Sequence, residues 1–268
     1  MDFGYTVQNF FTNKDFLDGD RLVGKIFHPM QIIFSAIIFG AIIFFAILLK
    51  KKYDESKYKK ILTVIWICMV VFEILIVAWE TFSAKEIAFD VKGGLSLYPC
   101  SIILYALPFA IWGKGNVRNA ACGYTCTLGM MGALINSFYP ANVLSSYSVL
   151  SFAGLHTVFY HAALLFCALT MLLTGYHSYG MAKKWYQLFI PCIPSLIISI
   201  PANIVNYTCE ADYMWFRWET SYLPQIFGNT PKPIITVILY LLYIFVPTLF
   251  YLPMFIKHKY NNKKGYPV

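Results

Sequence analysis

The amino-acid sequence predicts an all-α membrane protein, a single bundle of seven transmembrane helices. Three observations predict it: the composition, the number of long apolar stretches, and the alternation of charge between those stretches. Hydrophobic residues occupy 59% of the 268 positions, and charged residues occupy only 13%. That charged share is about half the usual share in a soluble domain. A chain of this composition is expected to lie mostly inside a bilayer.

Seven stretches are long and apolar enough to cross a bilayer, which takes about 20 mainly apolar residues per helix. Gly123, Gly129 and Gly132 lower the helix propensity of the fourth stretch, but small residues also let membrane helices approach closely. Prolines interrupt the sixth and seventh stretches, and such breaks are tolerated where they are buried in protein or beside a cavity. The predicted spans are 29–49, 61–82, 95–113, 118–138, 149–174, 186–206 and 233–256.

The charges of the loops predict the orientation of the bundle. Basic residues concentrate in the connections 50–60, 114–118 and 175–185 and in the C-terminal tail. With seven spans, these four segments fall on the same side of the membrane. Because basic loops favour the cytoplasm, the N-terminus is predicted outside and the C-terminus inside the cell. The expected organisation is an extracytoplasmic N-terminal segment at 1–28, a membrane domain at 29–256 and a basic cytoplasmic tail at 257–268, in the cell membrane.

The positions of the basic residues favour a membrane surface over a nucleic acid as the partner of this protein. A net charge of +8 could suit a nucleic acid, but these charges flank the spans, where they face the membrane surface. The seven cysteines show no paired CxxC spacing, which argues against a disulfide framework and a thiolate zinc site. The expected partner is the lipid bilayer, with no nucleic acid, no cofactor and no metal site.

Ionisable residues inside the predicted spans point to a functional site. Glu73, Cys100 and His161 lie in stretches with little or no other charge, and a charge in hydrocarbon costs several kcal/mol unless it is paired or faces a polar cavity. At about 1.5 Å per helical residue, these three residues and His156 all lie in the outer half of the bilayer. That depth matches the acyl chains and backbone of an outer-leaflet lipid.

One hypothesis is nucleophilic catalysis. Cys100 would be the nucleophile after an imidazole removes its proton, and Glu73 would orient that imidazole. Pro99 is expected to begin or kink the helix there, which would expose N–H groups able to stabilise an oxyanion. His156 and His161 are five residues apart, about 140° around a helix, so only one of them is expected to face the site.

Other hypotheses remain for the same residues. They could simply pack, with Glu73 paired to a polar neighbour. A zinc site made of Glu73, Cys100, His156 and His161 is weaker, because the histidine spacing is poor for chelation. A non-enzymatic transporter or receptor for lipids or small molecules would also place broken helices beside a polar cavity. A membrane scaffold would have no internal cavity.

Several motifs resemble those of the YwaF and transmembrane protein 164 family of integral membrane proteins, over about Glu73 to Phe255. The run Leu95-Ser96-Leu97-Tyr98-Pro99-Cys100 resembles a family "LPLHLC" motif. The resemblance extends to Gly132–Pro140 ("QALLTP"), Tyr160–Leu165 ("SHG" and an apolar run), and Asn206 with Asp212-Tyr213-Met214 ("N…NYM"). Tyr98-Pro99, Gly132 and Asp212 depart from the family's His-Leu, Gln and Asn.

The resemblance implies a cysteine-dependent acyltransferase acting on phospholipids. Cys100 would accept the acyl group, His161 would be the base, with His156 as second choice, and Glu73 would be the orienting acid. Residues in the matched stretches would contact the substrate, namely Asn206, Asp212, Tyr213, Asn136 and Tyr98. The implied partner is a membrane phospholipid or another fatty-acyl substrate.

Overall fold

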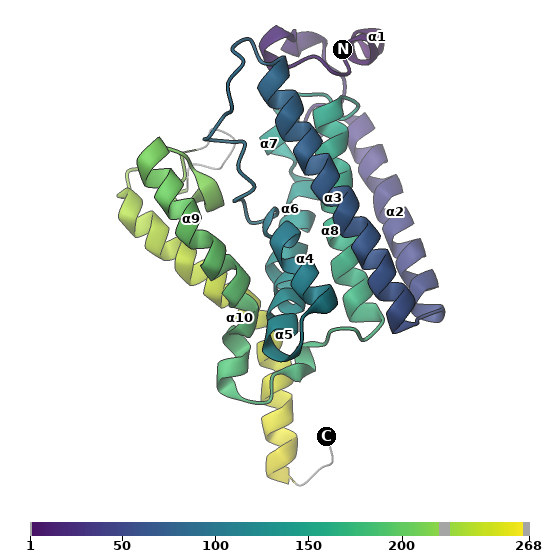
Figure 1. Ribbon diagram of the computed structural model, residues 1–268, viewed down its shortest axis with the longest axis vertical. Helices are drawn as coiled ribbons and strands as arrows, with labels where there is room; N and C mark the ends of the chain where they lie inside the picture. Colours follow the sequence, from purple (N-terminus) through teal and green to yellow (C-terminus); the bar gives the residue numbers. More distant parts are fainter. Residues whose placement is uncertain (1, 220–225, 265–268) are drawn as a thin grey trace.

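The computed structural model describes residues 2–219 and 226–264, and all regular structure in these ranges is helical. Figure 1 shows α2, α3 and α8 on one flank, α9 and α10 on the other, and α4 to α6 between them. The helices in chain order are α1 (Phe3–Gln8), η1 (Lys14–Phe16), η2 (Gly19–Arg21), α2 (Pro29–Lys51), α3 (Glu55–Ser83), α4 (Ile102–Trp112), α5 (Gly115–Tyr124), η3 (Thr125–Gly129), α6 (Met130–Phe138), α7 (Ala141–Leu144), α8 (Phe152–Leu173), η4 (Tyr179–Met181), η5 (Trp185–Cys192), α9 (Ile193–Cys209), η6 (Tyr213–Trp215) and α10 (Lys232–Lys264).

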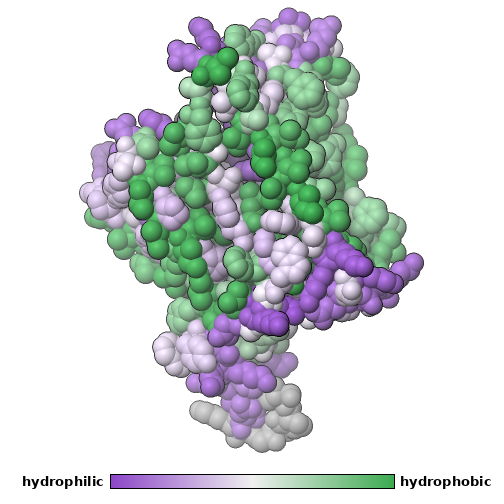
Figure 2. Space-filling view, viewed as in Figure 1, coloured by the Kyte–Doolittle hydropathy of each residue, from purple (hydrophilic) through white to green (hydrophobic). Residues whose placement is uncertain are grey.

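Within the described ranges, five helical segments are long and apolar enough to cross a membrane. They are α2, α3, α8, η5 with α9, and α10. Figure 2 shows hydrophobic residues over the middle of one face and hydrophilic residues toward its two ends. The all-α membrane protein predicted from the sequence is therefore confirmed, with five candidate spans in place of the seven expected.

The third expected span, 95–113, differs from the prediction. Only α4 is helical there, and its 11 residues extend about 16 Å, roughly half of a hydrocarbon core. The preceding chain forms turns, because Gly94 N–H bonds to Asp90 O and Ser101 N–H bonds to Tyr98 O. Ile102, Ile103 and Leu107 of α4 are fully buried. This short helix thus lies in the middle of the bundle, and a non-helical segment leads into it.

The fourth expected span, 118–138, is divided among three elements. α5 and α6 are joined by η3, a π-helical turn. The Thr125 and Thr127 hydroxyls donate to the carbonyls of Ala121 and Gly123, one turn earlier, which bends helices. A π turn holds one more residue than an α turn of the same length and is common near functional sites.

Prolines act differently in the last two predicted spans. Pro191 lies in the 3₁₀ segment η5, where the sixth span breaks, and Pro201 lies inside α9. α10 continues as one helix through Pro247 and Pro253. The break expected in the sixth span is present, whereas the seventh is not interrupted.

The N-terminal segment folds onto the ends of α3 and α8. Trp79 Nε1 donates to Phe11 O (2.8 Å), Lys14 N–H donates to the Tyr147 hydroxyl (3.2 Å), and Phe152 N–H donates to Phe10 O (3.0 Å). The segment is therefore an ordered cap over one end of the bundle. Figure 1 shows the C-terminus at the opposite end. Which end faces the cytoplasm remains the prediction made from the loop charges.

Candidate functional site

Glu73 connects three separate parts of the chain. Its Oε1 accepts a hydrogen bond of 2.6 Å from the Ser96 hydroxyl, and its Oε2 lies 3.6 Å from His156 Nε2. The side chains of Glu73 and His156 are only 17% and 13% exposed. The carboxylate therefore has partners on α8 and on the segment before α4, as a carboxylate at this depth requires.

Cys100 lies two residues before α4 and faces α6. A Cβ atom added at Gly132 would lie 3.0 Å from the Cys100 Sγ, so the absence of a side chain at Gly132 makes room for the thiol. The Tyr124 hydroxyl donates to the carbonyl of Pro99 and fixes the turn that carries Cys100. The thiol also lies within electrostatic range of Glu73.

α4 begins at Ile102, three residues after Pro99, so Pro99 lies in the turn before the helix. Its N-cap residue, Ser101, makes no side-chain capping hydrogen bond. The first N–H groups of a helix have no partner within the helix itself. Uncapped helical N–H groups therefore lie next to Cys100 in the chain.

The two histidines of α8 have different partners. His156 meets Glu73, whereas His161 Nδ1 lies 2.7 Å from Thr157 O. A carbonyl only accepts, so Nδ1 of His161 carries the proton and its Nε2 has a free lone pair. Tyr160 lies between the two imidazoles, with ring centroids 5.6 Å from His156 and 5.8 Å from His161.

Asn206 and Tyr213 connect α9 to the segment that leads to Cys100. The fully buried Asn206 amide donates to Tyr213 O (2.9 Å) and accepts from Tyr213 N–H (2.7 Å). The Tyr213 hydroxyl accepts from Leu95 N–H (2.9 Å) and donates to Val91 O (2.7 Å). The Tyr98 ring packs on Tyr213 at 5.0 Å. These three side chains thus hold the backbone around Cys100.

Asp212 organises the loop after α9. Its carboxylate accepts from the backbone N–H groups of Arg217, Trp218 and Glu219. The loop contains four non-glycine residues with left-handed backbone, φ about 55°, namely Glu210, Met214, Trp215 and Trp218. Such residues cost about 1–3 kcal/mol each and persist only where neighbouring contacts hold them.

Asn136 lies apart from the cluster of Glu73, His156 and Cys100. It is on α6, is only 8% exposed, and lines a small hollow with Gln31 and Ser35 of α2. Of the residues predicted for the site, the structure brings together Glu73 and His156, places Cys100 nearby, and uses Asn206, Tyr213 and Tyr98 as supports of the cysteine segment.

Ser96, Gly132 and Tyr160 belong to the site although the sequence analysis gave them no role. All three lie within the motifs that resemble those of the family. Ser96 and Gly132 contact the Glu73 carboxylate and the Cys100 thiol, respectively. The Tyr160 hydroxyl is buried without a hydrogen-bond partner among the described residues and lies within electrostatic range of Glu73 and Cys100. A polar residue within a mainly apolar stretch of sequence was the signal available for Ser96 and Tyr160.

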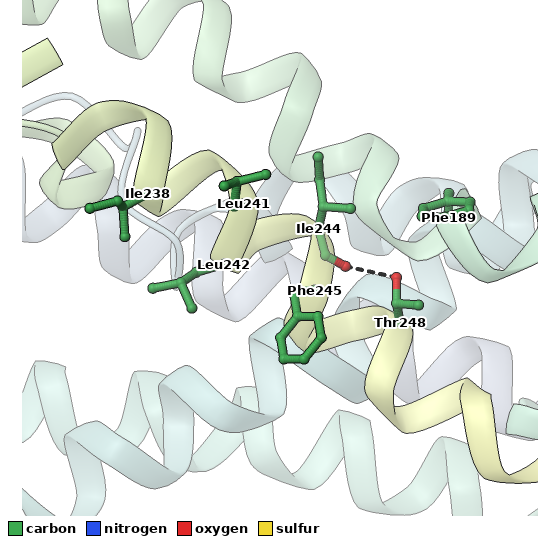
Figure 3. A pocket seen from close by; sticks show the side chains of 7 residues that line it. All are labelled: Phe189, Ile238, Leu241, Leu242, Ile244, Phe245 and Thr248. Atoms are coloured by element: carbon green, nitrogen blue, oxygen red, sulfur yellow. Dashed lines mark hydrogen bonds between the residues drawn. The ribbon is translucent and has the colours of Figure 1, made fainter. Parts of the chain in front are cut away.

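An apolar groove lies elsewhere, along α10. It measures about 480 Å³, and Figure 3 shows the apolar side chains that line it, together with Thr248. The Thr248 hydroxyl donates to Ile244 O (2.8 Å) within its own helix. The groove therefore offers no free reactive group, and we assign the chemistry to the cluster around Glu73.

The Gly132 contact can be tested by the reactivity of the thiol. Gly132→Val should slow the labelling of Cys100 by N-ethylmaleimide on the order of tenfold, because overpacking by a side chain costs about 1–3 kcal/mol. The labelling rate is measured by peptide mass spectrometry. Gly40→Val is the control, since a Cβ at Gly40 meets nothing within 4 Å. Equal labelling rates in both variants would show that Gly132 does not shape the space around the thiol.

Comparison with known proteins gives a family for this architecture. No curated protein and no solved structure matches the chain. The family model described as "TMEM164 family" matches residues 25–257, which include four of the five candidate spans, most of α10 and every residue of the candidate site. The resemblance seen in the short motifs is thereby confirmed, and the chain belongs to the TMEM164 family of membrane proteins.

Proposed function

We propose that this protein is a membrane-embedded acyltransferase that moves a fatty acyl group of a glycerophospholipid through a thioester on Cys100. His156 is the general base, and Glu73 orients it. The single observation that carries the proposal is the buried Glu73–His156 pair, joined through Ser96 to the segment that ends in Cys100. The motif resemblance favours His161 as base, but the proximity of Glu73 to His156 Nε2 (3.6 Å) favours His156.

The proposed reaction has two steps. Cys100 gives its proton to His156, and the thiolate attacks the ester carbonyl carbon. The ester C–O bond then breaks, the departing lysolipid oxygen takes the proton from His156, and the acyl group remains as a thioester. An acceptor hydroxyl next gives its proton to His156 and attacks the thioester carbonyl carbon. The C–S bond then breaks, the acyl group leaves on the acceptor oxygen, and the Cys100 thiolate takes the proton back from His156. Water as acceptor would make the same site a hydrolase.

Donors for the intermediate oxyanion are available near the thiol. The buried Tyr160 hydroxyl lies near the Ser101 side chain at the start of α4, and the first turn of α4 has no side-chain cap. Preorganised donors of this kind stabilise the charge that develops on the carbonyl oxygen. We further propose that the site lies in the outer half of the cell membrane. Phospholipids of the bilayer would reach it by lateral diffusion.

Trapping of the thioester tests the proposal. The protein is incubated in liposomes with phosphatidylcholine that carries an alkyne-tagged acyl chain, and the adduct is mapped by mass spectrometry. We expect a hydroxylamine-sensitive adduct on Cys100, formed about 10²- to 10⁴-fold more slowly in His156→Gln, the usual contribution of a general base. His161→Gln is the matched control and should retain most of the rate.

Two other outcomes would change the proposal. Loss of the adduct in His161→Gln, with His156→Gln unaffected, would move the base to His161 and keep the thioester. Labelling spread over several cysteines, independent of both histidines, would overturn acyl transfer. A lipid transporter or receptor would then be favoured, and it predicts that Cys100→Ser is tolerated while Glu73→Gln is not.

A further inference from the structure

A second polar site lies between α2, α6 and α8. Ten residues line a hollow there, and none of them is charged. Gln31, Ser35, Asn136 and Ser137 give it a polar end, and Ile38, Phe39 and Ile42 continue it along α2. Asn136 was expected from the resemblance to contact the substrate, but neither Cys100 nor the Glu73–His156 pair lines this hollow. The second site therefore does not depend on the proposed acyl transfer.

The Asn136 amide is the observation that points to a ligand. The residue is only 8% exposed, and its side chain makes no hydrogen bond to any residue in the described ranges. Its amide atoms are not completely enclosed, and the residue lines the hollow. An amide held in an apolar environment without a partner costs about 1–3 kcal/mol. Membrane proteins satisfy such groups from inside the protein or from a bound molecule.

The neighbouring polar groups leave further hydrogen-bonding capacity. Gln31 Nε2 donates to Ser35 Oγ (3.2 Å), and Gln31 Oε1 accepts from Phe27 N–H (3.2 Å). The Ser35 hydroxyl is thus an acceptor for Gln31, and its own proton stays free for another acceptor. Asn136 and Ser35 together present donors and an acceptor but no charge.

The size and shape of the hollow restrict the ligand. The space is about 20 Å³, enough for about one water-sized group. A hydroxyl or a carbonyl oxygen fits there, whereas a phosphate does not fit and would find no cation. From Gln31 to Ile42 the side chains change from polar to apolar over about 16 Å of α2. A polar end above an apolar strip matches the glycerol-ester region of a lipid and its acyl chain.

We propose that Asn136 and Ser35 bind an ester carbonyl or hydroxyl of a membrane glycerolipid, whose acyl chain lies along Ile38, Phe39 and Ile42. The lipid is recognised by its uncharged glycerol-ester region and not by its headgroup. The site is separate from Cys100, so a Cys100→Ala variant should still bind this lipid.

Photo-crosslinking in nanodiscs tests this inference. Two probes carry the same diazirine-bearing acyl chain, one a diacylglycerol and the other a phosphatidylcholine. Both should label the α2 peptide that contains Ile38 and Ile42. Asn136→Leu and Ser35→Ala should each reduce that labelling about fivefold, the effect of one lost hydrogen bond. Ile135→Leu, a lipid-facing neighbour that is 56% exposed, is the control and should not change it.

The contrary results are specific. Equal labelling of α2 in Asn136→Leu, Ser35→Ala and Ile135→Leu would mean that only the surrounding bilayer lipid is captured and that water occupies the hollow, which overturns the inference. Labelling by phosphatidylcholine but not by diacylglycerol would overturn recognition through the uncharged region. Ser35→Ala removes a single half-buried hydroxyl, so the test stands even if Asn136→Leu folds poorly.

Discussion

Cys100→Ala is expected to reduce acyl transfer from phosphatidylcholine to a lysophospholipid by at least about a thousandfold, because it removes the atom that would carry the acyl group. Folding should be retained. Cys100 is only half-buried in a turn, and its Sγ makes no hydrogen bond to a described residue. The measurement is transfer of a labelled acyl chain in liposomes, with the apparent Tm of each variant in detergent.

Cys68→Ala is the matched control for this result. Cys68 is an exposed cysteine of α3, so its removal tests for general effects of losing a membrane thiol. We expect unchanged transfer in that variant. Full transfer by a folded Cys100→Ala protein would exclude a thioester on Cys100, whatever the histidines do.

Asn206→Leu is expected to destabilise the protein by about 3–5 kcal/mol. The variant loses two hydrogen bonds, each worth about 1 kcal/mol, and leaves the buried N–H of Tyr213 without a partner, at about 1–3 kcal/mol. The Tyr213 carbonyl keeps the Phe216 N–H at 3.3 Å. The apparent Tm should fall by on the order of 10 °C. Because Tyr213 holds Leu95 and Val91, Cys100 should also react with maleimide at a changed rate.

The control for Asn206→Leu is Asn203→Leu, on the same helix. The Asn203 amide donates to Ser199 O (2.9 Å) and to the Tyr240 hydroxyl (2.7 Å), and neither group touches the cysteine segment in the described structure. We expect a smaller loss of stability and an unchanged rate at Cys100. If Asn203→Leu altered the Cys100 rate as much as Asn206→Leu, the link through Tyr213 would be wrong.

The long membrane-crossing helices were the part of the fold that the sequence predicted best. An apolar stretch of about 20 residues has few alternatives to a helix in lipid, so α2, α3 and α8 closely follow the predicted ranges. The third stretch was mistaken because hydropathy does not record where hydrogen bonds end a helix. Residues 95–101 are apolar enough to form part of a membrane span. The Ser96 hydroxyl, however, bonds to Glu73, and Leu95 N–H bonds to the Tyr213 hydroxyl. These bonds hold residues 95–101 in turns.

The site was predictable only in its composition and depth. The ionisable residues of the spans identified Glu73, Cys100 and the two histidines, and placed all four in the outer half of the bilayer. The partner of each histidine depends on the rotation of α8 against α3, which is set by packing between residues distant in sequence. The same limit applies to Asn206 and Asp212. Both were expected to contact substrate, and the structure shows that both bond to backbone groups of the loop that follows α9.

The π turn η3 has a consequence for how this family can change in evolution. Because a π turn holds one extra residue within the length of an α turn, deleting one residue from Thr125–Gly129 should restore a regular helix and leave α6 on the same face. Gly132 would stay at the thiol and Asn136 would stay beside Gln31. A deletion inside α6 itself would instead rotate every later residue of that helix by about 100°. Within this helix, single-residue length changes in the family should therefore be confined to the π turn.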